Sequence, residues 1–445
     1  MGADGKTGVD GLPRAHAALT PAHRSWRTKV FVATWLSYVG FYFCRKPFSA
    51  AKAAIQDETG WDATTLANIY AAYLIAYAIG QFVASQMGTR LGPRRNVLLG
   101  MGLSIGCTVA MGVTLDPWLW AGLIGVNGLA QATGWSGNVG TMAGWFHKHE
   151  RGRVMGLWST NFTVGALSSA WVLGWVLSLR DEGMPSPWRW CFFAGAIVLA
   201  AIWIQYFFFQ RNLPEDVGLP AIDDPVTAVD ESRTPEPPQV GYMGLSRSSW
   251  INLLLVSGFY FFAKFVRYAV WSWATYFLVR NYALSNAEAN VYATAFELGG
   301  LPGVFITGWL SDRYFKSKRA GVALIMMVGM TAATGALVLF GSSGVWPFTI
   351  LLFLVGFTLY GPDALLSGAG AMDVGGRYRA TFATAVISGF GSSGPVVQEL
   401  VIARMYDSKG GSLGPVFVLL FASTAVATLF CAALVWRNRR GGGGI

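Results

Sequence analysis

Twelve long apolar runs, separated by short polar connections, occupy most of the chain. Each run has about 18 residues or more, the length that an α-helix needs to cross the roughly 30 Å hydrocarbon layer of a bilayer. The runs lie at residues 30–48, 64–87, 96–115, 118–146, 154–179, 190–210, 250–279, 287–310, 320–341, 345–369, 380–404 and 413–436. The pattern therefore predicts an all-α membrane protein with twelve transmembrane helices.

The longest polar stretch divides these runs into two sets of six. Residues 211–248 are rich in proline and acidic side chains and cannot bury enough apolar surface to fold alone. We interpret the stretch as a linker between two bundles. The expected organisation is a cytoplasmic N-terminal tail (1–29), a six-helix bundle (30–210), the cytoplasmic linker (211–248), a second six-helix bundle (249–436) and a cytoplasmic C-terminal tail (437–445).

The composition excludes a soluble protein, and the distribution of charge sets the expected orientation. Of the 445 residues, 53% are hydrophobic and 13% are charged, which is too apolar for soluble domains. The net charge is +10, but 23 of the 33 Lys and Arg residues fall in the tails and connections on one side, and six, Lys52 among them, on the other. Because cytoplasmic connections carry an excess of Lys and Arg, we predict both termini in the cytoplasm. The protein is expected to be multi-pass in the cell inner (plasma) membrane, contacting the lipid bilayer and not nucleic acid.

No motif in the sequence is typical of a metal site, a cofactor site or an enzyme. The four cysteines fall in apolar runs, where we expect packing residues rather than disulfides. His147 and His149 have a weak metal-like spacing, but they stand in a basic connection that topology already explains. We predict no metal, no cofactor and no catalytic residue.

Two arginines stand inside long apolar runs at equivalent places in the two halves. Arg45 and Arg267 are 222 residues apart. An arginine at the bilayer centre costs about 2.5–3.5 kcal/mol on insertion scales, so it marks a functional site unless its side chain reaches the interface. Guanidinium groups match phosphate oxygens bidentately. The pair predicts a site for a phosphate-bearing anion, and the alternative is that Arg45 and the adjacent Lys46 extend to the membrane surface.

Polar side chains accompany both arginines at helical spacing. Tyr38, Tyr42 and Arg45 recur at intervals of four and three residues, which places them on one face of a helix. Lys264 precedes Arg267 by three residues and shares its face for the same reason. We expect both faces to line the space between the halves, with the tyrosines donating hydrogen bonds to the substrate.

Three acidic residues fall inside predicted spans. A buried carboxylate must pair with a cation, bind a proton or contact water. Glu297, in the span that follows the one carrying Arg267, is the best candidate partner for a cation. Asp363 and Glu399 are more typical of local helix-end or packing positions.

The connection after the second run of each half carries a related basic motif. The first reads Thr-Arg-Leu-Gly-Pro-Arg-Arg and contains Arg90 and Arg94, and the second reads Gly-Trp-Leu-Ser-Asp-Arg and ends with Asp312 and Arg313. The second motif resembles the Gly-x-x-x-Asp-Arg loop of the major facilitator superfamily, whereas the first has Thr89 in place of the acid. The resemblance implies two six-helix repeats that move around a central substrate site, with these residues in gating loops.

The chain also resembles the organophosphate:phosphate antiporter family over nearly its whole length. The most specific segments are Phe-Cys-Arg-Lys-Pro-Phe at 43–48, Val-Arg-Tyr at 266–268, Phe-Glu-Leu-Gly-Gly-Leu-Pro-Gly at 296–303 and Arg-Asn-Leu-Pro-Glu-Asp-Val-Gly at 211–218. In that family the arginines that match Arg45 and Arg267 bind phosphate. The resemblance also implies that Lys46 and Glu297 form a pair that rearranges as phosphate arrives.

Several positions depart from the glycerol-phosphate type of that family. Phe162 stands where that type has a histidine, Gln81 where it has a lysine, Ser272 where it has an acid and Lys264 where it has a tyrosine. The resemblance therefore implies phosphate binding but does not identify glycerol-3-phosphate as the substrate.

Together these observations predict a secondary active transporter that exchanges a phosphorylated small molecule, such as a sugar phosphate, for inorganic phosphate. We expect it to act as a monomer. Two alternatives stay open from the sequence. One is a membrane sensor of sugar phosphates that has the same arginines and no transport, and the other is a proton-coupled exporter, for which Glu399 is the candidate titrating carboxylate.

Overall fold

A computed structural model describes residues 19–146, 151–179, 183–184, 186–220, 222, 246–314, 319–366 and 371–440. The first half contains α1 (Pro21–Ala50), α2 (Lys52–Thr59), α3 (Ala63–Leu91), α4 (Pro93–Val113), α5 (Pro117–Gln131), α6 (Thr133–Trp145), α7 (Arg151–Trp158), α8 (Thr160–Ser178) and α9 (Pro187–Phe209). The second half contains α10 (Arg247–Tyr282), α11 (Asn286–Ala293), α12 (Ala295–Tyr314), α13 (Arg319–Phe340), α14 (Val345–Ala364), α15 (Ala371–Ser408) and α16 (Gly414–Arg439). Two short 3-10 helices lie at Pro214–Val217 and Gly341–Ser343.

The helices account for twelve crossings of a membrane. Eight of the described helices are long and apolar enough to span a bilayer by themselves, namely α3, α4, α9, α10, α13, α14, α15 and α16. The 30-residue α1 supplies a ninth crossing. The last three are the pairs α5–α6, α7–α8 and α11–α12, each interrupted at one residue whose φ stays at −63°, −65° or −69°. Because these angles are helical, each pair continues as one crossing, and the predicted all-α fold with twelve spans is confirmed.

Polar residues at the helix starts explain where several elements begin. The Oδ1 atoms of Asp62 and Asp116 accept the backbone N–H three residues later at 2.7 Å, which caps α3 and α5. The side chain of Thr20 caps α1 in the same way. That cap starts the helix at Pro21, nine residues before the first apolar run, so α1 extends into the stretch predicted as a tail.

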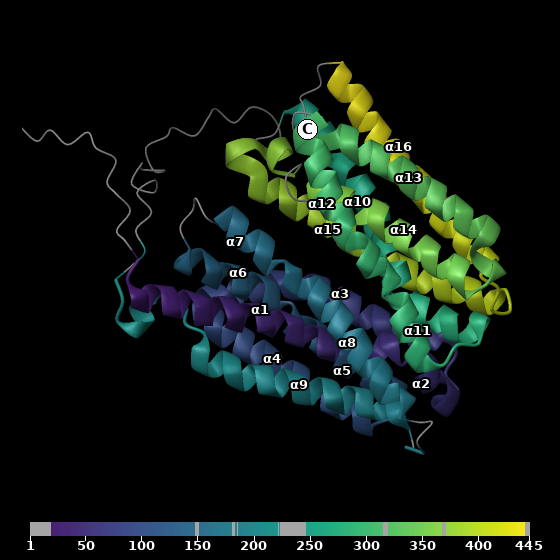
Figure 1. Cartoon of the computed structure of the whole chain (residues 1–445), viewed down its shortest axis with the longest axis horizontal. Coiled ribbons are helices and arrows are strands. Elements are labelled where there is room, and N and C mark those ends of the chain that lie inside the picture. Colours follow the sequence, from purple (N-terminus) through teal and green to yellow (C-terminus); the bar gives the residue numbers. More distant parts are fainter. Residues whose placement is uncertain are drawn as a thin grey trace, which may run out of the picture.

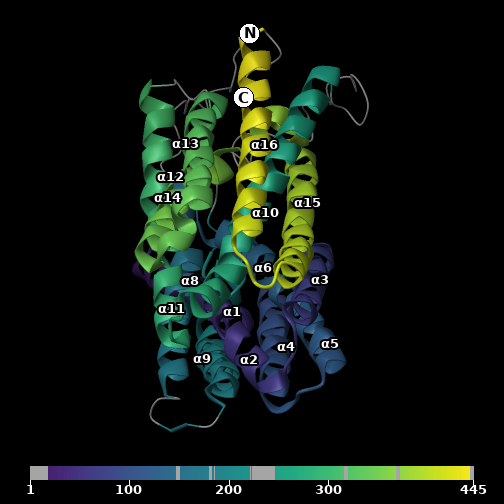
Figure 2. The same ribbon diagram turned by 90° about the vertical axis from the view of Figure 1, so that its right-hand side faces the viewer.

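The two halves lie side by side with their helices along a common direction. In Figure 1, α1 to α9 form the lower group of ribbons and α10 to α16 the upper group, and α2 and α11 come together at the right. Figure 2 shows α2 low in the molecule and the last turn of α16 at the top. We call the end that holds α2, α11 and the last turn of α15 the far end. Across the interface, α15 packs on α3, α11 packs on α8 and α10 packs on α1.

The surface of the bundle carries many exposed apolar side chains. Trp118, Leu339 and Phe305 are 85%, 73% and 71% exposed, and they belong to a much larger set of exposed large hydrophobic residues. Such a surface is unfavourable in water but suits contact with lipid tails. The packed core is built mainly within each half, and it crosses to the other half through Ala63 and Trp271.

Candidate functional site

A small cavity lies where α1 and α3 of the first half face α10 of the second half. Its volume is about 50 Å³, and its lining consists of Tyr42, Arg45, Tyr70, Tyr73, Leu74, Tyr77, Arg267, Tyr268 and Trp271. Both intramembrane arginines therefore line one cavity between the halves. Five tyrosines and one tryptophan surround them, and these side chains offer hydrogen-bond donors and ring faces to a ligand.

Neutral groups hold Arg45 in this cavity. Its Nε donates to Oε1 of Gln131 at 2.8 Å, and the Tyr73 hydroxyl donates to the same oxygen at 3.1 Å. The Arg45 guanidinium carbon lies 5.0 Å and 5.1 Å from the ring centroids of Tyr42 and Tyr77. Its Nη2 is buried and has no hydrogen-bond partner among the described residues. Because an unpaired buried donor is costly, this nitrogen is suited to bind an oxygen atom of an incoming ligand.

A further layer of polar contacts orients Gln131, which is fully buried at the end of α5. Its Nε2 donates to Asn127 Oδ1 at 3.1 Å and to Ser104 Oγ at 3.4 Å. Asn127 in turn donates through Nδ2 to the Cys44 carbonyl at 3.0 Å. These bonds turn the Gln131 oxygen toward Arg45. Sequence reasoning missed Gln131, although an amide inside an apolar run is a signal that could have found it.

Arg267 differs from Arg45 because it has an acidic partner. Its Nη1 donates to Asp363 Oδ2 at 2.6 Å, and its guanidinium carbon lies 4.5 Å from the Tyr360 ring centroid. Asp363 does stand at the end of α14, as predicted, but its interaction is not local, because its carboxylate pairs with Arg267 of α10. The charge of Arg267 is compensated, whereas the hydrogen bonds of Arg45 within the described chain go to a neutral amide. The cavity is left with excess positive charge.

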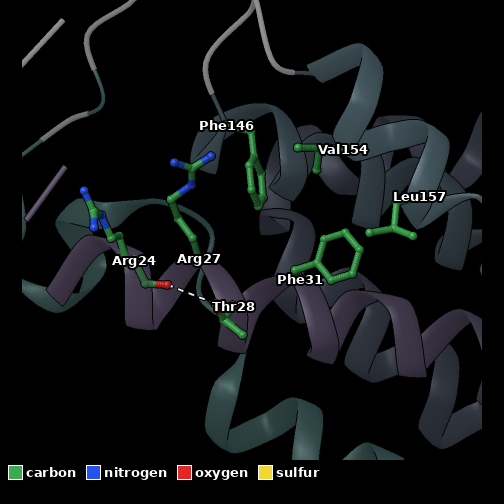
Figure 3. A pocket seen from close by; sticks show the side chains of 7 residues that line it. All are labelled: Arg24, Arg27, Thr28, Phe31, Phe146, Val154 and Leu157. Carbon is green, nitrogen blue, oxygen red and sulfur yellow. Dashed lines mark hydrogen bonds between the residues drawn. The ribbon is translucent and has the colours of Figure 1, made fainter. Parts of the chain in front are cut away.

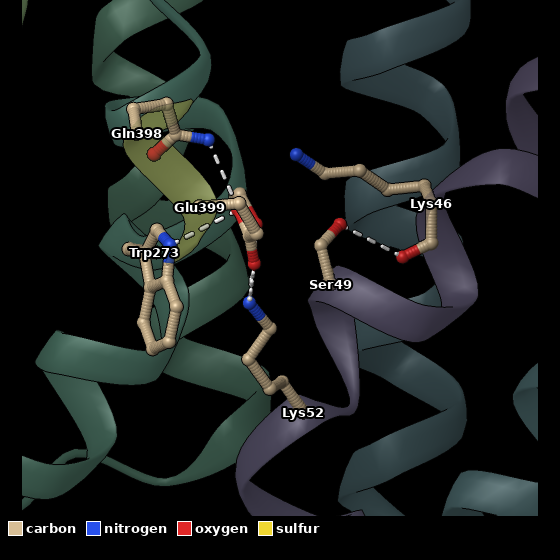
Figure 4. A network of polar contacts seen from close by, with 7 residues as sticks. Lys46, Ser49, Lys52, Trp273, Gln398 and Glu399 are labelled. Carbon is tan, nitrogen blue, oxygen red and sulfur yellow. Dashed lines mark hydrogen bonds and ion pairs between the residues drawn. The ribbon is translucent and has the colours of Figure 1, made fainter. Parts of the chain in front are cut away.

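A buried ion pair joins the halves at the far end, and sequence reasoning missed it. Lys52 Nζ of α2 lies 2.8 Å from Glu399 Oε1 of α15, and both side chains are 0% exposed. Figure 4 shows the carboxylate between Lys52, Trp273 and Gln398. Trp273 Nε1 and Gln398 Nε2 donate to Glu399 Oε2 at 3.1 Å and 3.0 Å, and Ser272 Oγ donates to Oε1 at 3.1 Å. Lys52 is therefore not an outer surface residue, and Glu399 is not a local packing residue.

Other contacts close the same end of the molecule. Hydrogen bonds join Thr64 to Asp407, Arg280 to Gln56 and Asp57, Tyr276 to Gln56, and Asn290 Nδ2 to the Ala50 carbonyl. Arg280 also donates to the Ala53 carbonyl, and together with the bonds from Lys52 to Ser272 and Glu399 these contacts join the two halves at the far end. The structure therefore represents a state in which the halves are joined beyond the cavity on that side.

Comparison with known proteins identifies the family to which the chain belongs. A family model described as Major Facilitator Superfamily matches residues 30–266, which is more than half of the chain. The chain belongs to the Major Facilitator Superfamily. Among solved structures, a D-xylose-proton symporter shares the fold with a TM-score of 0.67 at 13% identity, and the match covers 91% of this chain and 97% of that one. Membership of this superfamily makes the protein a membrane transport protein and not an enzyme.

Relatives within the superfamily show which group of transporters the chain is similar to. The chain is 28% identical to a glycerol-3-phosphate transporter of Bacillus subtilis, over 94% of each chain. It is 25% identical to a probable hexose phosphate transport protein of Chlamydia pneumoniae, over 92% of this chain and 90% of the relative. It is 27% identical to the glucose-6-phosphate exchanger SLC37A2 of Xenopus laevis, over 93% of each chain. These matches confirm the predicted place in the organophosphate:phosphate antiporter family.

Two tyrosines are expected on the helix face of Arg45, and they differ in whether they line the cavity. Tyr42 lines the cavity. Tyr38 lies one turn away, outside the lining, with its ring centroid 6.0 Å from that of Tyr42 and 5.4 Å from that of Trp135. Only the nearer tyrosine faces the small cavity in this state.

Lys264 also lies outside the lining, although it shares a helix face with Arg267. Its Nζ is 4.7 Å from the ring centroid of Tyr260, and the side chain is half-buried. The structure therefore brings together the two arginines and Tyr42, and it leaves Lys264 one turn closer to the start of α10.

Lys46 and Glu297 are both buried, but they do not form a direct ion pair in this state. Lys46 Nζ lies 4.5 Å from the ring centroid of Trp271, a residue that lines the cavity. Glu297 is the acidic group that interacts electrostatically with Lys46. The two charges thus interact over a distance longer than a hydrogen bond, and Lys46 adjoins the cavity through its contact with Trp271.

The basic residues of the first gating loop flank the turn between α3 and α4. Arg90 is exposed in the last turn of α3. Arg94 donates its backbone N–H to Asn212 Oδ1 at 2.8 Å, and its guanidinium carbon lies 5.2 Å from the Phe207 ring centroid. Arg94 therefore ties the start of α4 to the chain after α9 in this state.

The second gating loop is described only in part. Arg313 is exposed, and its guanidinium carbon lies 5.9 Å from the ring centroid of Trp309. The side chain of Asp312, and all of His147 and His149, lie outside the described residues. Among the residues that are described, no group of three or more His, Cys, Asp or Glu side chains could hold a metal ion.

Proposed function

We propose that this protein exchanges a phosphorylated small molecule, such as a sugar phosphate, for inorganic phosphate by alternating access. The observation that carries the proposal is that Arg45 and Arg267, from opposite halves, line the same cavity. In transporters built from two repeats, the substrate site lies between the repeats, which move relative to each other around it. A ligand bound by one arginine from each half is therefore coupled to that movement.

The chemistry of the cavity favours a phosphate group. A phosphate has several acceptor oxygens with a geometry that matches two guanidinium groups. Arg45 offers a buried Nη2 without a partner, and Arg267 offers a charge that is shared with Asp363. A neutral sugar would not relieve the excess positive charge, and a cation would be repelled by it.

The relatives support the same class of substrate. Their names describe transporters of hexose phosphate and glycerol-3-phosphate and an exchanger of glucose-6-phosphate. The aromatic side chains around the arginines supply surfaces on which the organic part of such a compound can pack.

The proposed orientation places both termini in the cytoplasm of a cell with the protein in its inner (plasma) membrane, acting as a monomer. The excess of Lys and Arg on the side of the termini supports this orientation. The far end then faces the outside, and the Lys52–Glu399 network closes the external side.

The alternative of a proton-coupled exporter has less support. Its candidate titrating group, Glu399, is fully buried in an ion pair at the far end and does not line the cavity. The sensor alternative predicts phosphate binding without exchange, so a transport measurement distinguishes it from the proposed function.

Counterflow in liposomes tests the proposal. Purified protein is reconstituted in liposomes loaded with labelled inorganic phosphate, and efflux is followed after external addition of glucose-6-phosphate, glycerol-3-phosphate or phosphoglycerate. We expect at least one of these compounds to accelerate efflux, and we expect Arg45→Lys and Arg267→Lys to abolish most of the acceleration. Arg439→Lys, an exposed basic position at the end of α16 and outside the cavity, is the matched control and should behave as the native protein. Absence of counterflow with every phosphorylated compound, in a protein that still binds phosphate, would favour the sensor.

A further inference from the structure

The cavity that holds the two arginines is small for a whole phosphate ester. Its volume is about 50 Å³, whereas pockets that enclose an organic ligand usually have about 300–1,000 Å³. On one side of the cavity the halves are joined at the far end, for example by the hydrogen bonds of Lys52 to Ser272 and Glu399. With its phosphate in the cavity, an ester would therefore place its organic part on the other side, toward the start of α10.

Lys264 lies on that side of the cavity. Arg267, Tyr268 and Trp271 line the cavity, and Lys264 precedes them by three, four and seven residues. This spacing places Lys264 on the same face of α10. The later turns of α10 reach the far end, where Arg280 bonds to the first half. Lys264 is thus one turn from the cavity in the direction away from the far end.

Lys264 is also a cation without an acidic partner. Three other cations inside the bundle each interact with a carboxylate, and these pairs are Lys52–Glu399, Arg267–Asp363 and Lys46–Glu297. Arg45 and Lys264 form no ion pair with the acidic side chains that the structure describes. Lys264 Nζ instead lies 4.7 Å from the Tyr260 ring centroid, and the side chain is half-buried. Because a cation within the membrane is costly, a negative group of a ligand would be stabilised beside it.

We propose that the transported compound carries a carboxylate that binds to Lys264 while its phosphate binds to Arg45 and Arg267. The inference rests on the proposed exchange function and narrows its substrates to phosphorylated carboxylic acids. Three residues of an α-helix rise by about 4.5 Å, so Lys264 and Arg267 suit two groups that a short carbon chain separates. A second phosphate would bring about −1.5 to −2 charges to one ammonium group, whereas a carboxylate matches its single charge.

Two compounds with the same carbon skeleton test the proposal. Glycerol-3-phosphate and 3-phosphoglycerate differ at one carbon, which is a hydroxymethyl group in the first and a carboxylate in the second. Counterflow from phosphate-loaded liposomes gives the half-maximal concentration of each compound. We expect this concentration to be roughly tenfold lower for 3-phosphoglycerate in the native protein, as one hydrogen bond between charged groups would give. Lys264→Gln should bring the ratio of the two concentrations near one, and Lys264→Arg should keep most of the preference.

A variant away from the interface between the halves separates a specific contact from general attraction of the more highly charged compound. Arg24 belongs to a hollow at the start of α1 whose lining comes from the first half alone (Figure 3). Its side chain is exposed, and Arg24→Gln removes one positive charge, as Lys264→Gln does. We expect Arg24→Gln to keep the native preference. The proposal is overturned if Arg24→Gln reduces the preference as far as Lys264→Gln does.

The same measurements distinguish failure of this inference from failure of the proposed function. Exchange of glycerol-3-phosphate without a preference for 3-phosphoglycerate overturns the inference alone. An equal loss of affinity for both compounds in Lys264→Gln also overturns it, because the lysine would then contact the phosphate that they share. If neither compound exchanges, the proposed function fails, and displacement of labelled phosphate from the purified protein in detergent compares the two affinities instead. The inference then stands or falls on whether Lys264→Gln removes the preference in that measurement.

Discussion

Lys52 and Glu399 form a fully buried ion pair that links α2 of the first half to α15 of the second, with 2.8 Å between Nζ and Oε1. The second carboxylate oxygen of Glu399 is also satisfied, because Trp273 and Gln398 donate hydrogen bonds to it. Opening of the far end would separate the two charges and require water or new partners for each. The pair therefore stabilises the state in which the far end is closed.

Removing one partner of this pair should have a large effect, and removing both should have a smaller one. Glu399→Gln leaves Lys52 as a buried cation without a counter-ion, a change that costs about 3–5 kcal/mol in comparable sites. We expect a large fall in the melting temperature of the purified protein and more labelling of a cysteine introduced between the halves from the far side. The double variant Lys52→Met/Glu399→Gln should recover part of the stability.

A partly exposed ion pair at the same end provides the control. Arg280 and Asp57 are 2.6 Å apart, with side chains 27% and 43% exposed. Because exposed pairs contribute about 0–1 kcal/mol, Asp57→Asn should change the melting temperature only slightly. Equal effects of Asp57→Asn and Glu399→Gln would contradict the role given to the buried pair.

Arg267→Lys conserves charge but should severely impair exchange. Lysine replaces a planar fork with a point charge and cannot bind phosphate bidentately. A charge-assisted hydrogen bond contributes about 1.5–3 kcal/mol, so we expect exchange to fall roughly tenfold or more. Initial rates of phosphate counterflow measure the change. Near-native rates in Arg267→Lys would show that the guanidinium geometry is not used.

Asp363→Asn should strengthen phosphate binding. In the structure Asp363 occupies one donor of Arg267, and its negative charge competes with an anionic ligand for that guanidinium. Loss of the charge should therefore lower the KM for phosphate several-fold, while Asp363→Glu should keep a KM near the native value. A higher KM in Asp363→Asn would instead show that the carboxylate only positions Arg267.

Gln131→Leu should raise the KM for phosphate with a smaller effect on the maximal rate. The substitution removes the acceptor for Arg45 Nε and for the Tyr73 hydroxyl, so the guanidinium loses its orientation and two buried donors lose a partner. Gln131→Glu keeps an acceptor but adds a negative charge that competes with phosphate, and it should raise the KM as well. A native KM in both variants would show that Arg45 is oriented by other contacts.

The fold was predictable from the sequence because membrane crossing depends on local composition. Apolar runs of about 18 or more residues located all twelve crossings, including those made from two helices. The positions of Arg45 and Arg267 were informative for a similar reason, since a repeated placement of charged residues in apolar runs is visible along the chain.

The partners of these charges were not predictable in the same way. Helical periodicity tells which side chains share a face of one helix, but it does not tell which helix that face meets. Lys52 and Glu399 are 347 residues apart, and Lys52 follows α1 at a place where an outer connection was expected. The rule that a buried carboxylate needs a partner applied to Glu399 and Asp363, but the sequence favoured local helix-end or packing positions for both and indicated neither Lys52 nor Arg267 as a partner.

The glycine-rich segment before the second gating loop illustrates the same limit. The sequence around Gly299 and Gly303 suggests a bend in the helix. In the structure both residues allow α12 to approach α14, because a Cβ at either position would collide with the carbonyl oxygen of Phe353 or Phe357. Close packing through small residues is common between membrane helices. Backbone contact of this kind depends on the neighbouring helix, so the spacing of glycines along one helix does not predict it.

A structure of the protein with bound inorganic phosphate tests most directly the central claim that Arg45 and Arg267 together bind phosphate. The quantity to be read is the distance from the phosphate oxygens to Arg45 Nη2 and to the guanidinium nitrogens of Arg267. We predict hydrogen-bond distances to both arginines, with the contact between Arg267 and Asp363 lengthened or lost. Phosphate bound at a place remote from either arginine, with Arg45 and Arg267 unchanged, would contradict the account.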